Sequence, residues 1–103
     1  MLMLEFSMTP LGVGESVGSY VARCIRIVEA SGLDYRLHAM GTIIEGEIEP
    51  VFQVVQQCLL ALAEDCPRVS CSIKVDYRAG HTGRIESKVA SVASHLGHSP
   101  RTA

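Results

Sequence analysis

Two stretches of the chain, residues 2–9 and residues 68–77, alternate between an apolar set of side chains and a second set that is mostly polar. A period of two is the pattern of a β-strand with one buried face. Between these stretches, apolar residues recur every three or four positions, which is the spacing of one face of a helix. The chain therefore has to combine helices with a half-buried sheet, which places it in the α+β class.

Turn and cap residues divide the first half of the chain. Pro10 and the glycines that follow it are expected to end the first strand, and Ser16 is a candidate N-cap for a helix that runs to about Ser31. Gly32 occupies the position after this helix that favours glycine. Short strands are predicted at 35–39 and 42–48.

A second helix is predicted to start at Glu49-Pro50 and to end before Pro67. A weaker helical pattern covers residues 84–95. In the second helix the predicted buried face consists of Phe52, Val55, Leu59, Leu62 and Cys66, with Val51, Cys58 and Ala63 beside it.

The resulting order, β-α-β-β-α-β followed by a helix, predicts a ferredoxin-like fold with a four-stranded antiparallel sheet covered by two helices on one face. We expect a single domain over residues 1–96 and a flexible tail over 97–103. The first and third strands should be central in this topology. The other face of the sheet has no element left to cover it fully, and it should hold Glu5, Ser7, Ile43, Glu45, Glu47, Ser72 and Lys74.

Composition narrows the possible partners. The chain has 103 residues, of which 48% are hydrophobic and 19% charged, so intrinsic disorder is excluded. No uncharged apolar run approaches the length of a membrane span, and scattered basic residues with a net charge of −2 predict no nucleic-acid partner. The N-terminus lacks the basic region of a signal peptide, and the four cysteines contain no C-x-x-C, so we expect reduced thiols in a cytoplasmic protein.

So much apolar surface on so small a chain indicates a homo-oligomer. We expect the partner subunit on the uncovered sheet face and along the helix at 85–96.

Motifs for catalysis or metal binding are weak. Gly12-x-Gly14 lacks the spacing of a phosphate-binding loop, and no cysteine or serine has an evident base. His95 and His98 are three residues apart but lie at a helix end and in the tail. We therefore predict no metal site and no catalytic residue.

Carboxylates are more informative. Glu5, Glu45, Glu47 and Asp76 fall on the sheet face that the helices leave open, beside hydroxyl groups. Such a cluster suits a cationic small molecule that forms hydrogen bonds. The alternative is that Glu45 and Glu47 pair with Lys74 or with a neighbouring subunit, and the residues alone leave both possibilities open.

The run from Tyr35 to Glu47, YRLHAMGTIIEGE, closely resembles the signature Y-x-L-x-x-M-G-T-x-x-E-G of a family of small thiamine-binding proteins in the YkoF-like superfamily. The segments Glu5 to Gly12, Ser16 to Val21 and Ser72 to Val92 also agree with that family. The similarity covers about residues 3–93.

This resemblance implies ferredoxin-like subunits that assemble as a homodimer or homotetramer and bind thiamine, or its hydroxymethylpyrimidine moiety, without catalysis and with no further cofactor. Thiamine carries a cationic thiazolium and an aminopyrimidine with hydrogen-bonding edges. We accordingly expect Glu45 at the aminopyrimidine or the positive ring, hydrogen bonds from Thr42 and Ser7, and walls from Met40 and Ile43. The last predicted site residue, from the same or an adjacent subunit, is Asp76.

Two other functions remain open at this stage. One is a structural or regulatory homo-oligomer that has no ligand and uses the polar sheet face as its interface. The other is an enzyme that uses the carboxylates for acid–base chemistry, for which the fold alone is no argument.

Overall fold

The two alternating stretches pair with each other along their full length. They form β1 (Leu2–Leu11) and β4 (Arg68–Tyr77), which run antiparallel with Leu2 opposite Tyr77 and Leu11 opposite Arg68. The other side of β1 pairs with β3 (Gly41–Gly46), which in turn pairs with β2 (Asp34–His38). The computed structural model describes residues 1–14 and 17–102. Its antiparallel sheet has the order β2-β3-β1-β4, which confirms the predicted ferredoxin-like fold.

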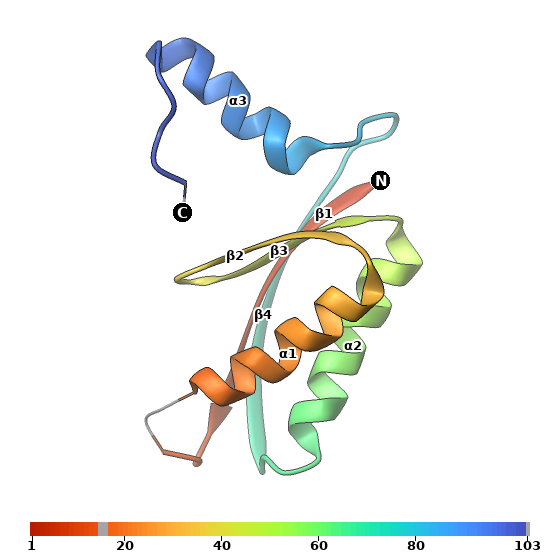
Figure 1. The fold of residues 1–103 in the computed structure, drawn as a ribbon. Coiled ribbons are helices and arrows are strands. Elements are labelled where there is room, and N and C mark those ends of the chain that lie inside the picture. Colours follow the sequence, from red (N-terminus) through yellow and green to blue (C-terminus); the bar gives the residue numbers. More distant parts are fainter. Residues whose placement is uncertain (15–16, 103) are drawn as a thin grey trace.

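Two helices, α1 (Gly18–Ser31) and α2 (Ile48–Ala63), cover one face of this sheet (Figure 1). Even-numbered side chains of β1 point toward these helices and odd-numbered ones point away, as the alternation requires. Each large apolar side chain buried in this way contributes about 1.5–3 kcal/mol to stability. The buried cluster consists of Leu2, Leu4, Phe6, Met8, Cys24, Val28, Ile44, Val51, Val54, Val55, Cys58, Leu62 and Cys66.

The first strand is longer than predicted, because Pro10 does not end it. β3 pairs with β1 only from Leu2 to Phe6. Beyond Phe6, β1 has β4 on one side and, among the residues that the structure describes, no strand on the other. Proline is tolerated at such a free edge, since its missing N–H is not needed there. Pro10 is buried opposite Val69, and β1 continues to Leu11.

The predicted buried face of α2 was partly wrong. Val51, Val54, Val55, Cys58 and Leu62 are buried, whereas Phe52 and Leu59 are exposed. Both sides of this helix are apolar, so periodicity could not choose between them. The packing of α2 beside α1 decides which side turns inward.

The predicted strand over 42–48 was too long, since β3 ends at Gly46. A Cβ atom at this glycine would lie 2.8 Å from Cδ2 of Leu33, so the backbone approaches its neighbour closely here. Glu47 is therefore not on the sheet face but at the N-cap position of α2, with extended backbone. In α1, Gly32 has the expected left-handed conformation at the C-terminus, while the predicted cap Ser16 lies outside the described residues.

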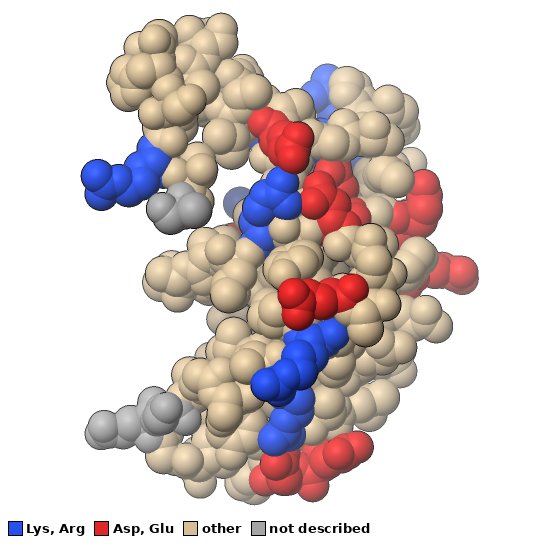
Figure 2. Space-filling model, in the orientation of Figure 1, with Lys and Arg blue, Asp and Glu red and all other residues tan. Residues whose placement is uncertain are grey.

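The third helix, α3 (Arg84–Leu96), lies apart from α1 and α2, beyond β2 and β3 (Figure 1). Its first turn is buried at Arg84 and Ile85, whereas Val89, Val92 and Leu96 are exposed. The surface that α3 forms at the top of Figure 2 carries few charged side chains. The radius of gyration is 14.9 Å, compared with about 13 Å expected for this length. Among the described residues no helix is both long enough and apolar enough to cross a bilayer.

Candidate functional site

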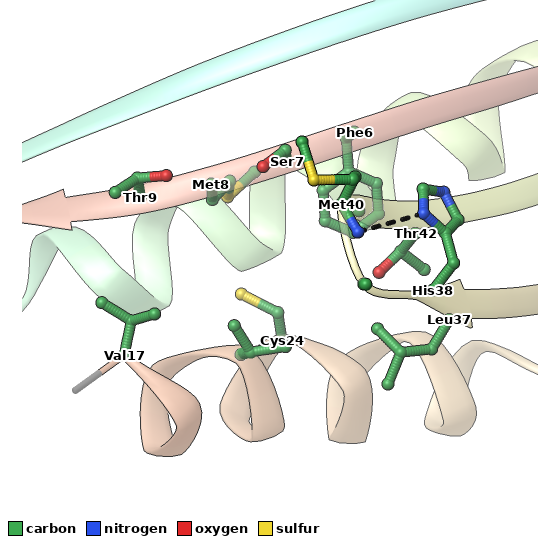
Figure 3. A pocket seen from close by; sticks show the side chains of 13 residues that line it. Phe6, Ser7, Met8, Thr9, Val17, Cys24, Leu37, His38, Met40 and Thr42 are labelled. Atoms are coloured by element: carbon green, nitrogen blue, oxygen red, sulfur yellow. Dashed lines mark hydrogen bonds between the residues drawn. The ribbon is translucent and has the colours of Figure 1, made fainter.

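A pocket of about 290 Å³ lies beside the part of β1 that has no neighbouring β3 strand. Its volume is at the lower end of the range for small-molecule sites, about 300–1,000 Å³. Three segments enclose it, namely residues 6–9 of β1, the turn between β2 and β3, and one side of α1 (Figure 3). The lining residues are Phe6, Ser7, Met8, Thr9, Val17, Val21, Cys24, Leu37, His38, Ala39, Met40, Gly41 and Thr42.

His38 holds the turn between β2 and β3 in place. The backbone N–H of Met40 donates to Nδ1 of His38 over 3.2 Å, as drawn in Figure 3. Nδ1 is therefore the acceptor, so the proton resides on Nε2, which lies 3.1 Å from Oε2 of Glu5 and donates to it. One imidazole thus connects the turn to the central strand β1.

Gly41 allows this turn to approach β1. A Cβ atom at Gly41 would lie 2.9 Å from the carbonyl oxygen of Phe6, and backbone at that distance cannot move aside cheaply. The two residues that flank Gly41 differ in their exposure to solvent. Met40 is 81% exposed at the pocket, whereas Thr42 is buried in it.

The lining combines a few polar groups with apolar and sulfur-containing walls. Hydroxyl groups come from Ser7, Thr9 and Thr42, and an imidazole comes from His38. Asp, Glu, Lys and Arg are absent from the lining within the described residues. Such a site can hold a ring in its apolar part and orient it by a small number of hydrogen bonds.

The other predicted site residues lie on the sheet face turned away from α1 and α2, here called the outer face. The side chain of Glu45 is only 5% exposed, and its Oε2 accepts a hydrogen bond of 3.0 Å from the backbone N–H of Arg84. A carboxylate at the first residue of a helix satisfies a free N–H and interacts favourably with the helix dipole. Glu45 therefore caps α3, whose own N-cap residue, Gly83, supplies no side-chain hydrogen bond.

Asp76 anchors the same helix. Its carboxylate accepts a hydrogen bond of 2.9 Å from Nζ of Lys88 and lies 3.1 Å from Nη1 of Arg84, and these contacts lower the pKa of Asp76. The Arg84 side chain is buried and also donates to the Asp76 carbonyl over 2.6 Å, while its Nε has no partner among the described residues. Another ion pair, Arg36 with Glu86 at 2.9 Å, joins β2 to α3.

The six predicted site residues therefore form two groups. Ser7, Met40 and Thr42 surround the pocket, and Ile43, Glu45 and Asp76 lie on the outer face near the start of α3. Thr42 and Ile43 are consecutive in β3, so their side chains must point to opposite faces.

Sequence reasoning gave no role to His38, and its hydrogen bond to Glu5 follows from the strand register, which periodicity does not reveal. Two other histidines contact the backbone: Nδ1 of His95 lies 2.9 Å from the carbonyl oxygen of Ser91, and Nδ1 of His98 lies 3.2 Å from that of Ser99. In the part of the chain that the structure describes, no group of three or more His, Cys, Asp or Glu side chains is placed to hold a metal ion.

An antiparallel sheet with two helices on one face, and a small mixed pocket beside the central strand β1, define an α+β protein of the ferredoxin-like type. Residues 4–93 match the profile of the family described as thiamine-binding protein, and the chain belongs to that family. This confirms the resemblance seen in the sequence.

Relatives from several organisms agree with this assignment. A UPF0045 protein of Mycobacterium bovis is 48% identical over 96 residues, which cover 92% of this chain and 94% of the relative. The solved structure of a Methanocaldococcus jannaschii protein matches with a TM-score of 0.83 and 30% identity, covering 89% of this chain and 95% of that one. A Thermotoga maritima protein with a provisional role in thiamine biosynthesis or salvage matches with a TM-score of 0.78 and 23% identity, covering 88% and 97%, and supports the fold.

Proposed function

We propose that this chain is a non-catalytic binding protein for thiamine or its hydroxymethylpyrimidine moiety, and that the ligand occupies the pocket beside β1. One observation carries the proposal: Met40, Gly41 and Thr42, the centre of the signature that resembles the thiamine-binding family, line the pocket from the end of the turn and the start of β3.

The chemistry of the lining supports this ligand class. The aminopyrimidine of thiamine has both donors and acceptors, and the hydroxyls of Ser7 and Thr42 can serve either role. Met40 and Met8 are adaptable sulfur-containing walls suited to an aromatic ring. A cationic thiazolium would be attracted by the Glu5 carboxylate behind His38 and by the net charge of −2.

The proposal assigns different work to the two groups of predicted residues. Ser7, Met40 and Thr42 contact the ligand. Glu45 and Asp76 hold the first turn of α3, since Arg84 already occupies one carboxylate oxygen of each.

Calorimetric titration with thiamine, hydroxymethylpyrimidine and thiamine phosphates tests this division. Thr42→Val keeps the shape of the side chain but removes the hydroxyl. The polar group of the ligand that this hydroxyl contacts is then left without a hydrogen-bond partner, so binding should weaken at least about tenfold. Glu45→Gln should stay within about twofold of wild type. The pocket assignment would be refuted by wild-type affinity in Thr42→Val, and a large loss in Glu45→Gln would return Glu45 to the site.

We further propose a cytoplasmic homodimer or homotetramer. The chain exposes 6810 Å² of surface, whereas a folded monomer of 11.1 kDa is expected to expose about 5,700 Å². The difference is of the size that one subunit contributes to a standard interface, about 800 Å². The same surface favours the second candidate, a structural or regulatory homo-oligomer without a ligand. A thermal-shift panel separates the two, because only a ligand-binding protein is stabilised by thiamine or its fragments.

A further inference from the structure

His38 is the last residue of β2, and both of its ring nitrogens have a partner. Nδ1 accepts the backbone N–H of Met40 over 3.2 Å (Figure 3), and Nε2 lies 3.1 Å from Oε2 of Glu5. A neutral imidazole has one acceptor and one donor, whereas an imidazolium has two donors. Only the neutral ring can therefore make both contacts at once.

The turn that His38 contacts has little other support. Ala39 and Met40 form a two-residue loop, since His38 pairs with Gly41 across the hairpin. The favoured two-residue hairpin loops have a positive φ at one or both positions, because that twist matches the strands. Neither Ala39 nor Met40 has a positive φ, and the Met40 side chain is 81% exposed. The hydrogen bond to His38 is therefore an important restraint on this turn.

This turn is also one wall of the pocket, which Ala39, Met40 and Gly41 line together with His38. Gly41 is held by its close approach to the Phe6 carbonyl of β1. Met40 has no such backbone contact, and its N–H bonds to the imidazole instead. The position of Met40 relative to the rest of the lining thus depends on His38.

The charges near His38 act on its proton in opposite directions. A carboxylate within hydrogen-bond distance favours the imidazolium, and cations on the same sheet face disfavour it. From α1, the described residues that line the pocket are uncharged. The charged groups on this part of the outer face are Glu5 of β1, Asp34 and Arg36 of β2, Lys74 of β4 opposite Glu5, and Glu86 of α3, which pairs with Arg36.

Protonation would break one of the two contacts of His38 and keep the other. A proton from solvent that binds Nδ1 turns this atom into a donor, which then faces the N–H of Met40, and two donors cannot hydrogen-bond to each other. At Nε2 the hydrogen bond becomes charge-assisted, so the contact with Glu5 becomes stronger. The imidazolium is thus held by β1 but no longer holds the turn.

We propose that His38 is a positioning residue of the pocket: its neutral ring holds Met40 where the ligand needs it, and protonation of Nδ1 releases the turn and lowers the affinity. The effect on affinity rests on the proposed function, whereas the effect on the turn does not.

Nuclear magnetic resonance of the ligand-free protein tests the effect on the turn. From about pH 8 to about pH 5, where histidine side chains usually change protonation, the Met40 amide signal should follow the same curve as the ring nitrogens of His38. The ring signals of His38 are those that are missing from His38→Asn. In this variant the Met40 amide should not respond, because an asparagine oxygen can accept the same N–H and does not titrate. A Met40 amide in wild type that is independent of the His38 titration would overturn the proposal.

Calorimetric titration with hydroxymethylpyrimidine tests the effect on affinity. This probe lacks the thiazolium, so the charge of Glu5 has no cation to attract. Relative to His38→Asn, wild type should lose about threefold to tenfold in affinity as His38 becomes protonated, which is the effect of one hydrogen bond. The comparison cancels any titration of the probe itself. At about pH 8, His38→Asn should bind about threefold to tenfold more tightly than His38→Leu, which has a similar shape but no acceptor.

A histidine outside the pocket provides the control. His95 lies in the last turn of α3, and His95→Asn should reproduce the wild-type pH profile. The same profile in wild type and His38→Asn, or equal affinities of His38→Asn and His38→Leu, would overturn the proposal. If the probe does not bind wild type at any pH, the proposed function is refuted and the effect on affinity with it. The Met40 amide then still decides whether His38 holds the turn, so the two failures are distinguishable.

Discussion

Glu45 and Arg84 are 39 residues apart in sequence, yet the Glu45 carboxylate accepts the first backbone N–H of α3 over 3.0 Å. The contact joins the central strand β3 to the first residue of α3. The position of α3 on the outer face therefore depends on one buried carboxylate and on the ion pairs of Asp76 and Glu86.

Removing this cap should loosen α3 without unfolding the core. Glu45→Ala leaves the Arg84 N–H unpaired, which costs about 1–2 kcal/mol, or about a 5- to 30-fold increase in local opening. Amide hydrogen exchange over residues 84–96 should accelerate by that factor, while exchange in β1 should not change. Glu47→Ala is the matched control, because Glu47 is exposed at the start of α2 and should leave α3 unaffected.

Acid should weaken the protein through Asp76 and Asp65. Hydrogen bonds from Lys88 and then Arg84 lower the pKa of Asp76, and the hydrogen bond from Arg23 lowers the pKa of Asp65. A carboxyl whose folded pKa lies below its unfolded value of about 3.9 contributes stability above that value, and the contribution is lost as the pH falls through the folded pKa.

The urea concentration at which half of the wild-type protein is unfolded should therefore decrease as the pH is lowered from about 5 to about 2. Asp76→Asn should be less stable than wild type at pH 5, and its stability should decrease less than that of wild type between pH 5 and pH 2. Glu64→Gln, which alters an exposed carboxylate without an ion pair in the described part of the chain, should retain the full slope. An unchanged slope in Asp76→Asn would contradict the prediction.

Replacing Gly41 even by alanine, the residue with the smallest side chain, should destabilise the folded protein. Gly41→Ala forces a Cβ atom against the Phe6 carbonyl oxygen at 2.9 Å, so β3 has to move away from β1, at a cost of about 1–3 kcal/mol. Gly18→Ala offers the matched control. A Cβ atom there meets nothing within 4 Å at the start of α1, and the change should stabilise by about 0.5–1 kcal/mol. Chemical denaturation of both variants, together with thiamine titration of Gly41→Ala, measures the effect.

Cys58, Cys66 and Cys71 should be slow to react in the folded protein. Burial raises the pKa of the thiols of Cys66 and Cys71, and the hydrogen bond with Cys24 together with burial raises that of Cys58. Thiolate is the reactive form, so a maleimide should label the native chain far more slowly than the urea-unfolded chain. Cys71, which is only half-buried, should be labelled first, and rapid native labelling of Cys58 would contradict the buried core.

Periodicity was sufficient to predict the fold because the decisive elements have clean patterns. β4 was predicted with the bounds that the structure shows, since Val69 to Tyr77 alternate without interruption. The pattern was ambiguous where two faces were both apolar, as at Phe52 and Val55 of α2. Only the packing of α1 against α2 resolves that choice.

The candidate site was harder to predict, because it depends on pairs that no local pattern contains. Alternation put Glu45 on the outer face correctly, but it could not show that α3 folds back over it. The hydrogen bond between His38 and Glu5 likewise depends on the register between strands. Glu47 was misplaced because the alternation of the sequence continues past Gly46, whereas in the structure β3 ends there and Glu47 is the N-cap residue of α2.

The mismatch in length between β1 and β3 has a consequence for specificity. In an antiparallel sheet, alternate residues of the unpaired stretch after Phe6 turn their peptide N–H and C=O groups toward the place that a longer hairpin would fill. The proposed ligand would then meet main-chain donors and acceptors that no side-chain substitution removes. The length of the turn between β2 and β3 then determines recognition. Inserting two residues at Ala39 and Met40 would extend the hairpin alongside β1. This would fill the pocket, although none of the lining residues would have been substituted.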